Sequence, residues 1–298
     1  PEDYALKYLD GKFAKKNPAV AQANKLAIAA GYNYAANTHQ FANNYTVAPA
    51  PREKGTYRSI NGNVATAWGL CAAAEKAGLP LFCGSYPITP ATVILEELAK
   101  RKDLGVKTVQ AEDEIAGICT AIGAAFAGNF AVTTTSGPGL SLKSEALGLA
   151  VMTELPLVVV DVQRGGPSTG LPTKTEQSDL QQALYGRNGE CPVIVVAASS
   201  PSDCFHYAFE AGRLAMEHMT PVILLTDGFI ANGSEPWRIP EMKDYPAIQP
   251  PIVDKAPEGG FMPYVRNEKL ARGWAFPGKV GLEHRVGGLE KDCVKGCI

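Results

Sequence analysis

The sequence predicts an α/β fold, a doubly wound and mostly parallel sheet with helices on both faces. Between residues 61 and 227, helix-length amphipathic stretches alternate with short runs of valine, isoleucine and leucine. Gly, Pro, Ser or Thr marks each change, as is typical of the ends of helices and strands. The runs are apolar at every position, as in Leu157-Val158-Val159-Val160, and strands of parallel sheets covered on both faces have this pattern.

The expected elements follow one another in a regular order. A helix is expected over 64–77, ending at Gly78, and another follows the acidic residues 112–114 and runs to Ala127. Six strands are expected, over residues 79–83, 106–110, 130–134, 157–162, 193–198 and 221–225. Ligands of open α/β sheets bind beyond the carboxyl ends of the strands, so the loops after the strands are the candidate site.

Two flanking segments lack this alternation. Residues 1–55 combine Ala- and Lys-rich sequence, which favours helix, with a proline-rich linker, and we expect the end of a preceding domain. The central domain is expected over 56–234. Residues 235–298 carry eight prolines and eight glycines and predict an extended arm. Its aromatic residues leave two interpretations open: packing against something else, such as a partner subunit, or a loosely ordered linker.

Composition argues against several classes of protein. The formal net charge of -2 does not favour nucleic-acid binding, and apolar runs such as 155–160 are far shorter than the ~20 residues of a membrane span. The seven cysteines have no repeated Cys-x-x-Cys spacing, which favours plain thiols in a reducing cytoplasm. Cys293 and Cys297, the one close pair, cannot complete a four-thiolate site, and we expect no metal site. The chain begins at Pro1 and reads as a piece of a longer polypeptide.

The loop after the first expected strand reads Tyr86-Pro87-Ile88-Thr89-Pro90. Thr followed by Pro is typical of a helix start, with Thr89 as N-cap and Pro90 in the first turn. A threonine in this place is also next to helix-terminal N–H groups, which attract a carboxylate. The spacing favours the capping role and is compatible with both.

Three acids, Glu112, Asp113 and Glu114, stand directly before the next expected helix. Acids in this position complement the helix dipole, which accounts for one or two of them. Alternatively, one carboxyl group that is partly buried against a neutral heteroaromatic nitrogen shares a proton with that ring.

The loop after the fourth expected strand places Arg164 beside flexible glycines. This arginine either forms a structural ion pair or binds a carboxylate or phosphate through two of its guanidinium N–H groups. Residues 166–170 also match the Gly-x-Ser-x-Gly pattern of serine hydrolases, with Ser168 as the nucleophile. That interpretation is disfavoured, because proline and glycines lengthen the link from the strand and the later histidines lack an evident acid partner.

Three motifs together resemble one known family. They are Tyr86-Pro87-Ile88-Thr89-Pro90, Thr135-Ser136-Gly137-Pro138-Gly139, and the run Asp-Val-Gln-Arg-Gly-Gly-Pro-Ser-Thr-Gly-Leu-Pro-Thr-Lys-Thr-Glu-Gln over 161–177. In this order they resemble the alpha subunit of 2-oxoacid:ferredoxin oxidoreductases, most closely the 2-oxoglutarate type. The resemblance covers about residues 60–245. The segment before it looks like the end of the gamma domain that is often fused ahead of alpha, and a second alpha domain normally follows.

The resemblance implies roles for individual residues. The region is the family's pyrimidine-binding domain for thiamine diphosphate, in which a catalytic glutamate hydrogen-bonds the aminopyrimidine ring. In thiamine enzymes a helix glycine follows this glutamate after nine residues, which fits Glu114 and not Glu112. Thr89 and Arg164 resemble the pair that holds the 1-carboxylate of the substrate. The residues implied to contact the cofactor are Tyr86, Pro87, Ile88, Glu114, Ser136 and Gly137.

The resemblance also implies a partner. The sequence has no Gly-Asp-Gly followed by the Asn that would hold magnesium and diphosphate, and the family carries these sites and a 4Fe-4S cluster on a beta subunit. The implied reaction converts a 2-oxo acid, with 2-oxoglutarate favoured, and CoA into acyl-CoA and carbon dioxide, and passes electrons to ferredoxin. The alternative is a non-catalytic binding or assembly subunit, against which the presence of Glu114, Thr89 and Arg164 argues.

Overall fold

The computed structural model describes residues 2–39, 41, 43 and 45–287 and divides into two compact units. The first unit, residues 1–54, contains α1 (Glu2–Leu9), the π-helical turn η1 (Asp10–Ala14) and α2 (Pro18–Thr38). The second unit, residues 55–298, contains the sheet. Within the described residues, no helix has the length and apolar character needed to cross a membrane. Cys293 and Cys297 lie outside the described residues, and the five described cysteines form no disulfide.

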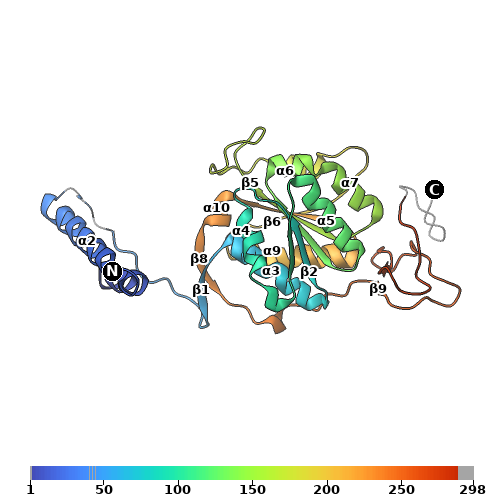
Figure 1. The fold of residues 1–298 in the computed structure, drawn as a ribbon, viewed down its shortest axis with the longest axis horizontal. Coiled ribbons are helices and arrows are strands. Elements are labelled where there is room, and N and C mark those ends of the chain that lie inside the picture. The colour runs from blue at the N-terminus through green and yellow to red at the C-terminus, as the bar shows by residue number, and fades with distance from the viewer. Residues whose placement is uncertain (1, 40, 42, 44, 288–298) are drawn as a thin grey trace. The chain divides into compact units, whose positions relative to one another are not determined.

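The second unit is built on a six-stranded parallel sheet (Figure 1). Its strands are β2 (Leu81–Ser85), β3 (Lys107–Gln110), β4 (Phe130–Thr135), β5 (Leu157–Gln163), β6 (Ile194–Ala197) and β7 (Pro221–Asp227). The order across the sheet is β3-β2-β4-β5-β7-β6, and every neighbouring pair is parallel. The predicted fold class is confirmed, and all six predicted strands are present with small shifts at their ends.

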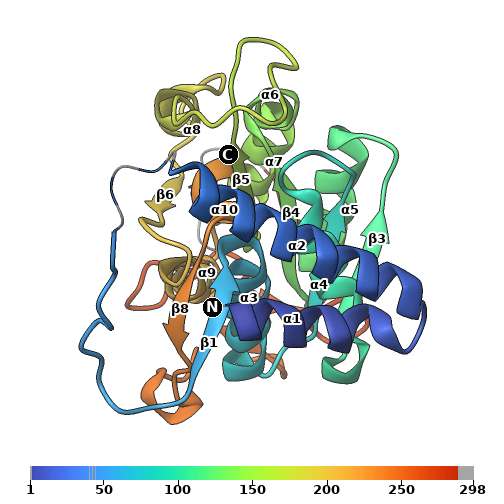
Figure 2. The ribbon, with the colours of Figure 1, turned by 90° about the vertical axis from the view of Figure 1, so that its left-hand side faces the viewer.

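Helices cover both faces of this sheet (Figures 1 and 2). One face carries α3 (Gly62–Ala77), α4 (Thr92–Ala99) and α9 (Asp203–His218), and the other carries α5 (Glu114–Phe126), α6 (Gly137–Leu142) and α7 (Ser144–Thr153). Val158 and Val160 pack into the first core, and Leu157 and Val159 pack into the second. Two separate cores therefore explain why this strand has no polar position over 157–160.

The remaining elements are short. They are β1 (Tyr57–Asn61), the 3-10 turns η2 (Lys102–Leu104) and η3 (Met242–Asp244), α8 (Leu180–Tyr185), α10 (Gly228–Asn232), β8 (Ser234–Arg238), β9 (Ile252–Val253) and β10 (Trp274–Ala275). β1 pairs antiparallel with β8, and β9 pairs parallel with β10.

Of two helix boundaries predicted from the sequence, the end of α3 is confirmed and the start of α4 is wrong. α3 ends where expected, with Gly78 in the left-handed conformation (φ 65°) that glycine adopts readily. The prediction that Thr89 caps a helix is wrong, because α4 begins at Thr92 with Ala91 as its N-cap residue. Instead, the Thr92 hydroxyl accepts a hydrogen bond from the N–H of Ile88 (2.8 Å), which closes a turn before the helix.

The arm after β8 packs on its own domain. Trp274 Nε1 donates to the carbonyl of Ala125 at the end of α5 (3.2 Å), and the buried Arg272 donates to the carbonyls of Thr153 and Glu154 at the end of α7 (both 3.2 Å). The last carbonyls of a helix lack partners within the helix, and the arm supplies donors to them. In its described part the arm is therefore ordered by packing, as the first interpretation expected, and the domain itself supplies the surface. The alternative of a loosely ordered linker is wrong.

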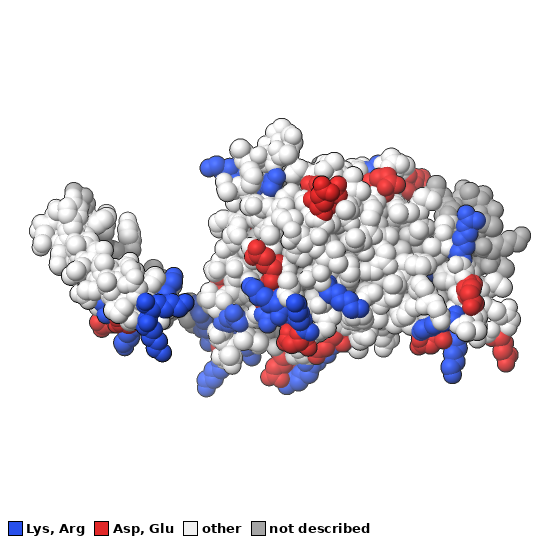
Figure 3. All heavy atoms as spheres, viewed as in Figure 1, with Lys and Arg blue, Asp and Glu red and all other residues white. Residues whose placement is uncertain are grey.

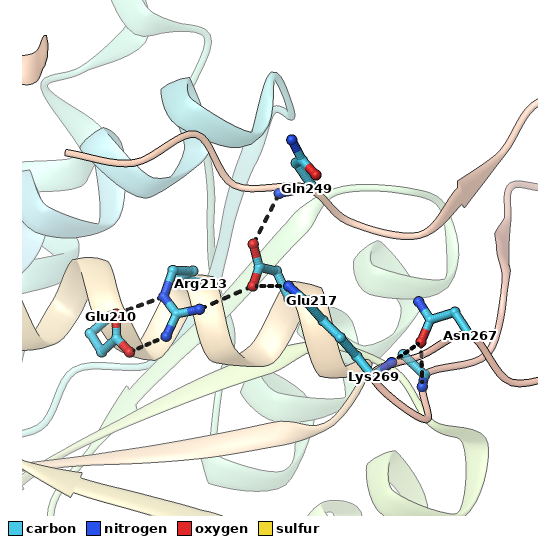
Figure 4. Close-up of polar contacts among 7 residues, drawn as sticks. Glu210, Arg213, Glu217, Gln249, Asn267 and Lys269 are labelled. Atoms are coloured by element: carbon cyan, nitrogen blue, oxygen red, sulfur yellow. Dashed lines mark hydrogen bonds and ion pairs between the residues drawn. The ribbon is translucent and has the colours of Figure 1, made fainter.

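Glu217 holds two segments of the arm against the end of α9 (Figure 4). Its buried carboxylate accepts hydrogen bonds from Arg213 (3.0 Å), Lys269 (2.6 Å) and the N–H of Gln249 (3.2 Å). Burial raises the pKa of this carboxyl group, but the three donors outweigh it and hold the pKa below its usual value. The arm is thus fixed at the amino edge of the sheet, opposite the carboxyl ends of the strands.

Candidate active site

The carboxyl ends of β2 and β4 lie where the strand order reverses. From β2 the chain crosses to β3 on one side and then returns to β4 on the other side of β2. Loops diverge at such a switch point and leave a crevice in which doubly wound proteins bind ligands. The predicted site residues follow strands next to this point: Tyr86, Pro87, Ile88 and Thr89 after β2, Glu114 after β3, Ser136 and Gly137 after β4, and Arg164 after β5.

Hydroxyl groups join the ends of β2 and β4. Ser85 Oγ lies 2.7 Å from Thr134 Oγ1 and 3.0 Å from the Thr134 carbonyl oxygen. One residue further along each chain, Tyr86 OH lies 3.1 Å from Thr135 Oγ1. All four residues are buried, so water does not compete for these bonds and the two loops are held in one relative position.

Glu114 begins α5 beside Tyr86. Asp113 is the N-cap residue, with Oδ1 accepting from the N–H of Ala116 (2.7 Å), so the Glu114 carboxylate is not used for capping. Glu114 is half-buried, whereas Glu112 is exposed. Burial raises the pKa of Tyr86, and the neighbouring Glu114 carboxylate raises it further. Tyr86 therefore stays protonated, with its hydroxyl beside the Glu114 side chain.

Gly139 allows these side chains to approach one another. A Cβ atom at this position would lie within 3.0 Å of Thr135 Oγ1, Tyr86 OH and Glu114 Cγ. Any other residue would therefore displace the group that orients Glu114. The last glycine of the Thr-Ser-Gly-Pro-Gly motif is therefore a packing requirement of the site.

Arg164 joins the loops after β2, β4 and β5 through a backbone carbonyl. Nη1 donates to the Thr89 carbonyl (2.6 Å), which also accepts from the Ser136 hydroxyl (3.2 Å), and Nη2 donates to the Thr169 carbonyl. The structure thus brings Thr89, Ser136 and Arg164 together, while the Thr89 side chain is exposed. Within the described chain, the buried Nε of Arg164 has no partner and no carboxylate pairs with the guanidinium. N–H groups therefore remain for an anion.

Two buried carboxyl groups lie beneath the loop that carries Arg164. Asp161, in β5, is fully buried, and neither of its oxygens meets an N–H or hydroxyl donor among the described residues. Burial and the neighbouring Asp179 carboxylate raise the pKa of Asp161, and burial raises that of Asp179. The raised pKa values favour protonation of the pair, and a protonated carboxyl group can donate to the neighbouring one. Asp179 also occupies the space that a Cβ atom at Gly137 would need.

Further bonds order the same loop, which stands at the top of the domain in Figure 2. Glu176 Oε2 accepts from the N–H of Gly166 (2.8 Å), and Gln163 Oε1 accepts from the N–H of Asp179 (3.0 Å). Gln177 Nε2 donates to the carboxylate of Asp227 (2.7 Å), the residue that caps α10. These bonds give the glycine-rich loop a fixed conformation. That conformation supports Arg164, whose Nη2 donates to the Thr169 carbonyl in the same loop.

The hydrolase interpretation finds no support. Ser168 is exposed, and in the part of the chain that the structure describes no histidine hydrogen-bonds it. His206, on α9, packs against Tyr207 and Tyr245 instead. In the same described part, no three His, Cys, Asp or Glu side chains are grouped so that they could hold a metal ion.

Sequence reasoning missed several residues of the site. The sequence did contain a signal for Asp161, because a charged residue there interrupts a run of apolar strand residues. Thr135 and Gly139 were noted only as parts of a motif, and their packing against Tyr86 depends on contacts between loops. Lys143, which is fully buried and donates to the Glu114 carbonyl (2.6 Å), had no local signal.

Comparison with known proteins places the chain in a family. The family model described as "Pyruvate flavodoxin/ferredoxin oxidoreductase, thiamine diP-bdg" matches residues 73–295. The chain belongs to this family. The resemblance found in the three motifs is confirmed, and the pyruvate flavodoxin/ferredoxin oxidoreductase model extends it beyond residue 245 into the arm.

Individual relatives narrow the similarity to the 2-oxoglutarate type. The chain is 59% identical over 289 residues to the 2-oxoglutarate oxidoreductase subunit KorA of Mycobacterium tuberculosis, which covers 97% of this chain and 44% of that protein. It is 43% identical to the 2-oxoglutarate synthase subunit KorA of Methanothermobacter marburgensis, over 69% of this chain and 53% of that one. The chain therefore spans about half the length of these family members.

A solved structure of the family has the same fold. It is the 2-oxoglutarate:ferredoxin oxidoreductase from Magnetococcus marinus, with 2-oxoglutarate, coenzyme A and succinyl-CoA bound. The TM-score is 0.82 at 37% identity, and the match covers 98% of this chain and 50% of that chain.

The raised pKa values of Asp161 and Asp179 predict a pH-dependent stability. Because the folded-state pKa is raised above that of the unfolded chain, the pair stabilises the fold fully at low pH, and this contribution is lost as the pH rises through the folded-state value. We expect the urea midpoint of the unmodified protein to fall more steeply with rising pH than that of Asp161→Asn. Asparagine keeps the shape, donates to Asp179 and does not titrate.

The control is Asp254→Asn, which changes an exposed carboxylate paired with Lys279. This variant should follow the pH dependence of the unmodified protein. Parallel curves for Asp161→Asn and the unmodified protein would show that the buried pair does not hold a proton.

Proposed function

We propose that this chain is the alpha-type subunit of a 2-oxoglutarate:ferredoxin oxidoreductase and supplies the pyrimidine half of its thiamine diphosphate site. The reaction is the oxidative decarboxylation of the 2-oxo acid with CoA to acyl-CoA and carbon dioxide, with the electrons passed to ferredoxin. The observation that carries the proposal is the half-buried Glu114, which lies beside the buried Tyr86 at the switch point of the sheet. The names of the relatives support the choice of substrate.

The residues at the switch point fit the pyrimidine ring of thiamine diphosphate. Glu114 offers a carboxylate acceptor to a heteroaromatic N–H and would hold or return a proton there, while the Tyr86 hydroxyl orients it. Half-buried Ile88 and exposed Pro87 offer apolar contacts, and Ser136 and Gly137 begin α6 beside them. When bound, the cofactor supplies the carbon nucleophile that attacks the keto carbon of the substrate.

Arg164 and Thr89 hold the substrate carboxylate in this proposal. The guanidinium is fixed by two backbone carbonyls, and its unused N–H groups supply charge-assisted donors. The exposed Thr89 side chain adds a hydroxyl on the same loop. Arg164 thereby acts twice, because it also sets the position of the Thr89 backbone.

A beta subunit completes the site in this proposal and carries magnesium, the diphosphate contacts and the 4Fe-4S cluster. Ile115, Leu171 and Phe229 expose 51%, 57% and 72% of their surface and follow β3, β5 and β7, on the edge where a partner would dock. Figure 3 shows a broad uncharged area in the middle of one face, with many charged side chains along its lower margin. The exposed apolar side chains of Ile115, Leu171 and Phe229 support a protein partner at this edge.

The domain assignment follows the same proposal. Residues 1–55 are the end of a gamma-like domain with its linker, 56–234 the pyrimidine-binding domain, and 235–298 an arm that leads to a second alpha domain. The thiols of Cys71, Cys83, Cys119, Cys191 and Cys204 suit a reducing cytoplasm.

The test of the function is a substrate panel on the complex of this chain with its beta partner. We expect ferredoxin reduction that requires both CoA and a 2-oxo acid, with 2-oxoglutarate giving the highest kcat/KM. A higher kcat/KM for another 2-oxo acid would show that 2-oxoglutarate is not the preferred substrate, but it would leave the proposed reaction type unchanged. No reduction with any of them would favour the alternative of a non-catalytic binding or assembly subunit.

Glu114→Gln should slow hydrogen–deuterium exchange at thiamine C2 in the assembled complex by ~10²- to 10⁴-fold, because glutamine keeps the shape but cannot take up a proton. The matched control is Glu112→Gln, two residues away and exposed, which should leave the exchange rate unchanged. The measurement is proton NMR of the C2 position after quenching. Loss of exchange in the control variant alone would assign the catalytic role to Glu112.

Arg164→Lys should lower kcat/KM for the 2-oxo acid while cofactor content stays the same. Lysine cannot reach both the Thr89 and Thr169 carbonyls and bind a carboxylate, and we expect a loss of about 2–5 kcal/mol in transition-state stabilisation. Steady-state kinetics and cofactor quantification check this. Arg187→Lys is the control, since Arg187 also binds backbone carbonyls but lies after α8. Equal effects in both variants would contradict a role in substrate binding.

A further inference from the structure

Lys143 is a buried cation directly behind the start of α5. It lies between α6 and α7 and is fully buried. Its Nζ donates to the carbonyl oxygen of Glu114 (2.6 Å) and lies 4.9 Å from the centre of the Tyr86 ring. Within the described residues, no carboxylate oxygen lies close enough to form an ion pair with it.

A purely structural role does not account for this lysine. Burying an ammonium group without a carboxylate partner is costly, and methionine or leucine would fill the same space without that cost. Both contacts of the ammonium group are with Glu114 and Tyr86, the residues that form the proton-transferring part of the candidate site. The cation is thus directed at two groups whose position the chemistry needs.

We propose that Lys143 is a positioning residue for Glu114: its ammonium group holds the first peptide of α5 and the face of the Tyr86 ring, and so fixes the direction of the Glu114 carboxylate. The proposal rests on the function proposed above. The cation binds the backbone carbonyl of Glu114 and lies against the ring of Tyr86, whose hydroxyl is next to the Glu114 side chain. Because one cation contacts both the backbone of Glu114 and the neighbour of its side chain, it limits both the place and the orientation of this residue.

Because both contacts need the charged form of Lys143, we expect this hold to depend on pH. Burial lowers the pKa of Lys143 to about 8, and the negative charges of Glu114 and Asp113 limit the fall. The other titratable groups near the ammonium group are Cys119 on α5, Cys83 on β2 and Tyr86. Burial raises the pKa of Cys83 to about 12, so that thiol stays neutral while Lys143 titrates. Loss of the lysine proton weakens both of its contacts.

The first test needs no cofactor. Amide hydrogen exchange over the first turn of α5 is measured in the assembled complex across a pH series and corrected for the intrinsic exchange rate. In the unmodified protein, protection should fall as the pH passes about 8. Lys143→Met should lack this step and show the lower protection throughout, and Lys143→Arg should restore protection. The amides of α3 serve as the internal control for global unfolding.

The second test uses the loaded complex. Exchange at thiamine C2 should slow by roughly ten- to a hundredfold in Lys143→Met, with cofactor affinity unchanged, and Lys143→Arg should recover most of the rate. Lys100→Met, which removes an exposed lysine on the far end of α4, should behave like the unmodified protein.

The outcomes separate this inference from the function on which it rests. Constant protection of α5 through pH 8 in the unmodified protein overturns it, even if Lys143→Met fails to assemble. The inference is also overturned if the Lys143→Met complex exchanges thiamine C2 at the normal rate while the Glu114→Gln complex exchanges it slowly. If Glu114→Gln itself exchanges normally, the proposed function fails, and amide exchange still decides whether Lys143 holds the start of α5.

Discussion

The ends of β2 and β4 are joined by hydroxyl groups where apolar side chains would be usual, and the candidate site is built outward from this contact. The bonds from Ser85 to Thr134 and from Tyr86 to Thr135 are buried and directional, so they fix the angle between two loops as well as their separation. The Tyr86 hydroxyl in turn lies beside the Glu114 side chain. A pair of valines at these positions would keep the strands together but would leave the loops free to turn.

Much of the fold could be predicted from the sequence because its determinants are local. Apolar runs of strand length and the glycine at position 78 depend only on neighbouring residues, and both were located closely. The grouping of Glu114, Thr89 and Arg164 was also predictable, since the carboxyl ends of parallel strands meet at one edge. Their identification as site residues came from the family resemblance, which periodicity alone does not supply.

The rest depends on contacts between distant residues. Thr89 has the sequence of a helix cap, but its carbonyl is bound by Ser136 and Arg164, 47 and 75 residues away, and the helix starts later. Lys143 looks like an ordinary surface lysine at the end of a short helix, and its burial against the start of α5 and the Tyr86 ring depends on tertiary packing. The arm has no periodicity, because the helix ends on which it packs determine its path.

The contacts of the arm have a consequence for the order of folding during synthesis. Trp274, Arg272 and the peptide of Ile248 donate to carbonyls at the ends of α5, α7 and α3, all of which leave the ribosome well before them. Until then, water must satisfy those carbonyls. Chains emerge from the N-terminus onward, so the carboxyl edge can assemble while the opposite edge is still hydrated. The last part of the domain to be completed is therefore the part furthest from its chemistry.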